Sequence, residues 1–266
     1  MAKPRLAIAA AALVIAGGLG NPARAQEEAS TPPHQQWSFN GVFGTYDRAA
    51  LQRGFQVYKE VCSACHPLKH LAFRDLEEIG YTDDQVKGIA GQSQVTDGPN
   101  DQGQMFQRPA RPSDPIPGPF PNDEAARAAN NGALPPDLSL ITKAREHGPD
   151  YVHALMTGFK DAPAGFKIND GMYYNEFFPG HQIKMPPPLT ADGQLTYADG
   201  AKATIPQMAH DVATFLSWAA EPNLEDRHRM GFKVILFLVV TVGVLYAAKR
   251  KVWAKLHQKD EPLPGA

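Results

Sequence analysis

The stretch Cys62-Ser63-Ala64-Cys65-His66 contains the only two cysteines of the chain. A Cys-x-x-Cys-His pattern is typical of the covalent attachment of c-type haem. Two thiols three positions apart on one turn can each add to a vinyl group of the same porphyrin and form thioethers. The adjoining imidazole of His66 is then placed to become the proximal iron ligand. The motif therefore predicts one covalently bound haem c.

Two other sites use a Cys-x-x-Cys pair. A thiol–disulfide redox site on a thioredoxin-like scaffold needs a surrounding βαβ unit, and no pattern of β-branched runs flanks residues 55–66. A structural zinc site needs four closed ligands, and the chain has no second cysteine pair. The sequence favours haem over both alternatives.

The first 25 residues read as an export signal. Lys3 and Arg5 form a charged start, residues 6–19 are apolar, and Ala23-Arg24-Ala25 is a small-x-small cleavage site. We expect residues 1–25 to be a signal peptide removed before Gln26. Export agrees with the cysteine motif, because haem is attached to c-type proteins outside the cytoplasmic membrane.

Residues 231–248, GFKVILFLVVTVGVLYAA, carry a single charge and are followed by Lys249-Arg250-Lys251. As a helix this run reaches roughly 27 Å, close to the ~30 Å of a hydrocarbon core. We predict a transmembrane anchor over 227–250 with a cytoplasmic tail at 251–266, because the flank after the run holds more Lys and Arg than the flank before it. Residues 26–226 would then form a periplasmic domain on a single-pass protein of the bacterial inner (cytoplasmic) membrane.

The overall net charge of −2 masks the strongly acidic character of the domain over residues 26–226, which we call the head. Residues 26–226 hold 15 Lys and Arg against 26 Asp and Glu, a net charge of −11. Such a surface argues against nucleic acid as a partner and favours a basic soluble protein. Plain solubility would explain the same charge equally well.

The head is predicted to be mainly α, with helices joined by long irregular loops. Apolar spacing predicts helices over 47–62, with Asp47 as N-cap, over 149–158, and over 204–220. Thr204 and Gln207 resemble a capping box. The proline-dense segment 108–121 excludes a helix or a central strand.

The second axial position of the iron decides the function. A thioether there gives an electron carrier, whereas an empty position gives a haem-based sensor or ligand-binding protein. Met185 is the preferred ligand because Pro186-Pro187-Pro188 stiffens the chain beside it. Met105 and Met172 also lie in expected loops and stay possible.

Longer stretches of the sequence, beyond the cysteine motif, resemble those of a known protein family. Residues 52–66 carry the haem motif, DGPN stands at 97–100, ARAANNGALPPDLS at 126–139, YYNEFFPGHQIKMPPPL at 173–189 and DVATFLSWAAEP at 211–222. Over 37–256 the chain resembles the cytochrome c1 family, the haem subunits of the ubiquinol–cytochrome c reductase (cytochrome bc1) complex.

The resemblance implies a mainly α, class-I cytochrome c-like haem domain, and it implies roles for individual residues. Cys62 and Cys65 would hold the porphyrin, with His66 and Met185 as axial ligands. The loop Asn130–Leu138 would cover the haem, and the side chains packed on its faces would be Pro136, Phe178 and Ile183. Arg145 and Tyr151 would meet a propionate, although Arg145 beside Glu146 also reads as a solvated surface charge. Lys184 departs from the small residue expected beside the axial methionine.

The resemblance also implies partners. The chain would carry single electrons from a Rieske iron–sulfur protein to a soluble c-type cytochrome, beside cytochrome b in a dimeric complex. It would serve as the electron-transfer subunit of an oxidoreductase, with no substrate chemistry of its own.

Overall fold

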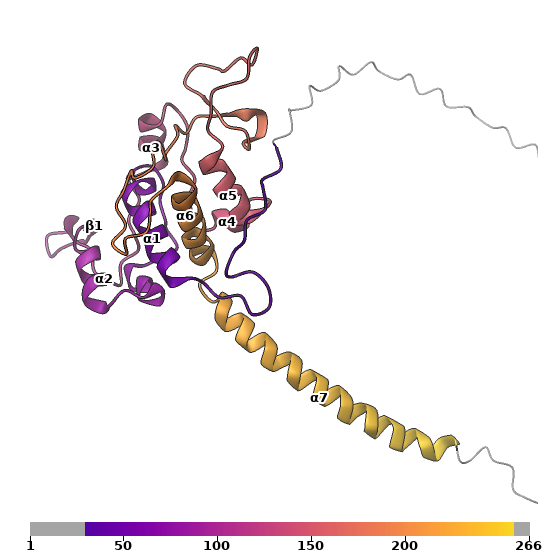
Figure 1. Ribbon diagram of the computed structural model, residues 1–266. Coiled ribbons are helices and arrows are strands. Elements are labelled where there is room, and N and C mark those ends of the chain that lie inside the picture. Colours follow the sequence, from indigo (N-terminus) through magenta and orange to yellow (C-terminus); the bar gives the residue numbers. More distant parts are fainter. Residues whose placement is uncertain (1–29, 258–266) are drawn as a thin grey trace, which may run out of the picture.

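The computed structural model describes residues 30–257, with side chains to residue 254. The predicted signal peptide and the end of the predicted tail lie outside the described residues. The described chain forms a head of helices and long loops, from which one long helix projects (Figure 1). The mainly α fold predicted from the sequence is confirmed.

Two helices form the centre of the head. Helix α1 (Arg48–Glu60) begins at the predicted N-cap Asp47, whose carboxylate accepts hydrogen bonds from the amides of Ala49 and Ala50. Helix α6 (Ile205–Ala220) packs along α1 (Figure 1). Gly54 permits this approach, because a Cβ there would lie 2.1 Å from the carbonyl oxygen of Asp211. The aromatic rings of Phe55 and Phe215 meet across the interface at 5.6 Å.

The predicted capping box of α6 forms only in part. The Thr204 hydroxyl accepts from the Gln207 amide at 3.3 Å, but the Gln207 side chain turns away and donates to Asp211 at 3.0 Å. The reason is electrostatic: a buried carboxylate attracts the amide group more strongly than the first turn of the helix does.

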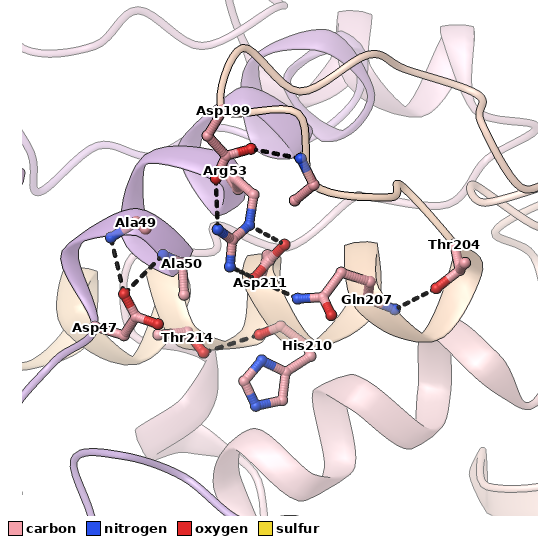
Figure 2. A network of polar contacts seen from close by, with 11 residues as sticks. Asp47, Ala49, Ala50, Arg53, Asp199, Thr204, Gln207, His210, Asp211 and Thr214 are labelled. Atoms are coloured by element: carbon pink, nitrogen blue, oxygen red, sulfur yellow. Dashed lines mark hydrogen bonds and ion pairs between the residues drawn. The ribbon is translucent and has the colours of Figure 1, made fainter.

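Asp211 belongs to a polar network that joins three parts of the head (Figure 2). Arg53 of α1 forms two hydrogen bonds with this buried carboxylate, Nε–Oδ2 at 2.8 Å and Nη2–Oδ1 at 3.0 Å. Its Nη1 donates at 2.7 Å to Asp199, in the loop that leads to α6. The loop 190–203 is thereby fixed to both central helices.

The remaining elements are short. They are the helices α2 (Asp83–Ala90), α3 (Asp123–Ala129), α4 (Ile141–Ala144) and α5 (Gly148–Thr157), and the 3₁₀ turns η1 (Cys62–Ala64), η2 (Phe73–Ile79) and η3 (Pro179–His181). Strands β1 (Gln94–Asp97) and β2 (Phe106–Pro109) pair antiparallel, as do β3 (Tyr173–Tyr174) and β4 (Gln182–Ile183). The proline-dense segment is irregular beyond Pro109, as predicted. Helix α5 confirms the helix expected over 149–158.

Helix α7 (Leu224–His257) includes the predicted anchor and extends beyond it at both ends. Residues Leu224–Ala254 are long and apolar enough to cross a membrane. The 34 residues of the helix span roughly 51 Å, so a bilayer core of about 30 Å leaves several turns outside it. Only residues 221–223 separate α7 from α6.

Candidate haem site

The cysteine motif lies on a tight turn directly after α1. The carbonyl of Cys62 accepts from the amides of Cys65 at 3.1 Å and His66 at 2.9 Å, which closes the turn η1. The buried hydroxyl of Tyr58 donates to the carbonyl of His66 at 3.1 Å. Both cysteines are free and half-buried. The turn therefore offers two thiols and one imidazole from a fixed backbone.

The Cys62 thiol is poorly suited to act as the nucleophile of disulfide exchange. Burial, together with the nearby Cys65, raises the pKa of the Cys62 thiol to about 12. Thiol–disulfide oxidoreductases depend on a cysteine whose pKa lies below the usual value. This environment disfavours the redox-dithiol alternative.

The imidazole of His66 is oriented by a backbone carbonyl. Its Nδ1 lies 2.8 Å from the carbonyl oxygen of Pro136, and burial lowers its pKa. A neutral imidazole that donates from Nδ1 has its Nε2 lone pair free for a metal, which is the usual arrangement of ligating histidines.

The loop that carries Pro136 is itself anchored. The Asn130 side chain caps α3 by donating to the carbonyl of Ala126 at 2.7 Å. The Asp137 carboxylate accepts from the amides of Lys69 and Ser139. The loop Asn130–Leu138 is thus tied to the segment that follows the cysteine motif.

The predicted methionine lies on a second anchored segment. Phe178, Ile183 and Met185 are half-buried within residues 178–185, and Ile183 pairs with Tyr173 between β3 and β4. After the three prolines Leu189 is buried, and Gln194 donates to the carbonyl of Pro188 at 3.0 Å.

Lys184 joins the two segments. Its Nζ donates to the carbonyl oxygen of Asn131 at 3.0 Å, and its side chain is exposed. The loop that orients His66 therefore also holds the residue next to Met185. This contact accounts for the departure noted at position 184, where a small side chain was expected.

The two residues predicted to meet a propionate are neighbours. Arg145 ends α4 and is exposed, while Tyr151 is half-buried in α5. Burial raises the pKa of the Tyr151 hydroxyl, and the positive charge of Arg145 opposes that effect. A cation and a phenol in this arrangement can donate hydrogen bonds to a carboxylate.

Tyr58 and Asp137 are not marked by any haem-ligand motif, and the sequence favours a surface or capping role for His181 over a ligand role. Tyr58 looks like a core residue of α1, but Asp137 two positions before Ser139 is an Asx-turn pattern that could have been recognised. His181 is buried and stacked on Tyr174 at 5.6 Å, and its Nδ1 has no hydrogen-bond partner among the described residues.

These residues fit a covalently attached haem. The chain supplies two free thiols and an imidazole with its Nε2 available, and it holds a methionine segment against the same loop. This combination defines a c-type cytochrome.

Residues 37–256 match the Cytochrome C1 family, and the chain belongs to that family. "Cytochrome c1" of Rhodospirillum rubrum is 46% identical over 93% of this chain and 96% of the relative. "Cytochrome c1-2, heme protein, mitochondrial" of Solanum tuberosum is 48% identical over 85% of this chain and 87% of the relative.

"Cytochrome b/c1" of Bradyrhizobium diazoefficiens is 51% identical over 97% of this chain. The chain spans 40% of the length of that relative. The cofactor is haem c, as in the rest of the family. Cytochrome c1 is a component of ubiquinol–cytochrome c reductase, so membership supports an electron-transfer role in that complex.

Proposed function

We propose that this chain is the membrane-anchored electron carrier of a ubiquinol–cytochrome c reductase. It takes single electrons from a Rieske iron–sulfur protein and passes them to a soluble c-type cytochrome. The observation that carries the proposal is the double attachment of the loop Asn130–Leu138, which meets His66 through Pro136 and the Met185 segment through Lys184.

Bound haem supplies a one-electron couple, and the protein's task is to hold its ligands. Cys62 and Cys65 would fix the porphyrin, while His66 and Met185 would be the iron ligands. Phe178, Ile183 and Pro136 would exclude water from its faces, and Arg145 with Tyr151 would bind a propionate. No general acid, base or nucleophile is required.

The acidic head fits a basic soluble acceptor, whose approach long-range attraction would accelerate. Helix α7 would anchor the head on the periplasmic side of the cytoplasmic membrane, with the C-terminus in the cytoplasm. Cytochrome b and the iron–sulfur protein would be its partners there, in a dimeric complex.

The axial methionine is tested by its absorption. A sulfur–iron bond gives the ferric protein a weak charge-transfer band near the red edge of the spectrum. Met185→Leu in the full haem-loaded chain should abolish that band and let the reduced protein bind carbon monoxide. Met172→Leu, at another half-buried loop methionine, is the matched control and should preserve it. Rapid stoichiometric carbon monoxide binding by the unaltered protein would instead establish the sensor alternative.

The docking of a basic soluble acceptor needs its own test. Reduction of a basic soluble cytochrome c by the reduced chain should slow steeply as salt rises, because screening removes the attraction. A rate independent of ionic strength would refute the acidic docking surface and leave the charge as an aid to solubility.

A further inference from the structure

A groove lies where the head meets α7. The loop 41–45 runs beside the first turns of that helix (Figure 1), and the two border an open groove of about 380 Å³. The helix contributes one face to the lining, which consists of Glu225, His228, Arg229, Phe232 and Lys233. The residues that line the groove are far from the haem motif in sequence and play no part in the proposed electron transfer.

The groove has fixed walls. The carbonyl oxygen of Gly44 lies 3.2 Å from Nδ1 of His228, and the amide of Tyr46 donates to Glu225 at 2.8 Å. Gly44 itself is packed so closely that a Cβ would lie 2.3 Å from the backbone of Phe39. The loop is therefore a built part of the helix junction.

The wall formed by the loop is apolar and faces outward. Phe43 is 79% exposed and Val42 is 64% exposed. The ring of Phe43 lies 6.1 Å from that of Phe232, at the start of the apolar run of α7. Exposed aromatic groups at this level suit the interface between water and hydrocarbon, where such side chains are favoured.

The groove also carries positive charge on an otherwise acidic head. Arg229 and Lys233 lie one helical turn apart, so both reach the same face. Lys233 forms no ion pair within residues 30–254. Glu225 pairs with Arg48 at 2.9 Å. Arg229 pairs with Asp226 at 2.9 Å, but both side chains are mostly exposed, so the other N–H groups of the guanidinium stay available to a ligand. The uncompensated positive charge of the groove is therefore that of Lys233.

We propose that this groove binds an anionic phospholipid of the surrounding bilayer. Lys233 and Arg229 receive the phosphate, and Phe43 with Phe232 contacts the first segment of the acyl chains. Cations beside an apolar surface that continues into a membrane-spanning helix match this ligand. The inference rests on the proposed membrane crossing of α7 and is otherwise independent of the electron-transfer role.

The test measures hydrogen exchange of the backbone amides of residues 41–45. The full haem-loaded chain is placed in nanodiscs of phosphatidylcholine alone, or of phosphatidylcholine with one third phosphatidylglycerol. We expect exchange to be about fivefold slower with the anionic lipid, because one uncompensated basic group, Lys233, contributes at the surface. Arg229→Gln with Lys233→Gln should remove the difference, and Phe43→Ser should reduce it.

Lys249→Gln with Lys251→Gln is the matched control, since it removes the same charge at the opposite end of α7 and should leave the difference intact. Equal exchange in both lipids would overturn the inference, whether the loop is open in both or covered in both by protein. Loss of the difference in the control variant would also overturn it. Haem absorbance that fails to co-elute with the nanodiscs would refute the membrane crossing, which is a separate result.

Discussion

Replacing Arg53 by methionine should destabilise the head far more than its partly exposed position suggests. The guanidinium forms two hydrogen bonds with Asp211, a carboxylate with no exposed surface (Figure 2). In the described structure, the other hydrogen bond to the Asp211 carboxylate comes from the side-chain amide of Gln207 at 3.0 Å. Without Arg53, this bond alone would remain. Breaking one side of a buried pair costs about 3–5 kcal/mol.

Asp199 provides the internal comparison. It pairs with the same guanidinium at 2.7 Å, but its side chain is 41% exposed. Water can replace most of that interaction, so Asp199→Asn should cost less than about 1 kcal/mol. The double variant Arg53→Met with Asp211→Leu should recover most of the loss, because it leaves no buried charge.

The assay is guanidinium chloride unfolding of the haem-loaded full chain in detergent, followed by Soret circular dichroism. The reasoning would be wrong if Arg53→Met cost no more than Asp199→Asn. It would also be wrong if the double variant were as unstable as Arg53→Met alone, since the cost would then come from lost packing of the arginine stem.

Three further outcomes are expected. Gly54→Ala should lower the melting temperature sharply because the new methyl group meets the backbone of α6. Gly88→Ala, where the added methyl group on α2 meets open space, should stabilise the head by about 0.5–1 kcal/mol. Equal melting temperatures for the two variants would contradict this. Lys184→Leu should cost at most about 1 kcal/mol and bleach the methionine charge-transfer band at a lower temperature, and an unchanged bleaching temperature would count against the Lys184 contact. Burial opposes ionisation of Asp150, but hydrogen bonds from His34, the Gln35 amide and Trp37 outweigh it and lower its pKa. The contribution of Asp150 to the unfolding free energy is therefore present above the unfolded pKa of about 3.9 and is lost as pH falls through the lower folded pKa. Asp150→Asn should flatten the loss of stability below pH ~4, and parallel curves of unfolding free energy against pH for the two proteins would refute this.

Sequence patterns correctly predicted those parts of the head whose structure depends on neighbouring residues in the chain. Asp47 caps α1 as its position before an apolar stripe indicates, and the prolines after Pro109 keep that segment irregular. The cysteine motif falls on a single turn because its backbone hydrogen bonds join residues three and four apart.

The contacts that assemble the candidate site could not be predicted from sequence alone. Lys184 reaches the carbonyl of Asn131, and His66 reaches that of Pro136; every residue offers such a carbonyl, so no side-chain pattern marks the partner. The Gln207 side chain does not complete the capping box for a similar reason. It donates instead to Asp211, a carboxylate that only the packing of α1 on α6 buries.

The short connection between α6 and α7 determines the orientation of the head relative to α7. Residues 221–223 are all that separates the two helices, Leu224 is buried, and Glu221 is held by both Lys143 and Arg227. So short and cross-braced a connection resists pivoting of the head on α7. With α7 in a membrane, as proposed, the cysteine turn would keep a constant distance from the lipid and a constant orientation. In the proposed function, any search for electron donors and acceptors would then be made by the partner proteins, and this chain would be the stationary relay between them.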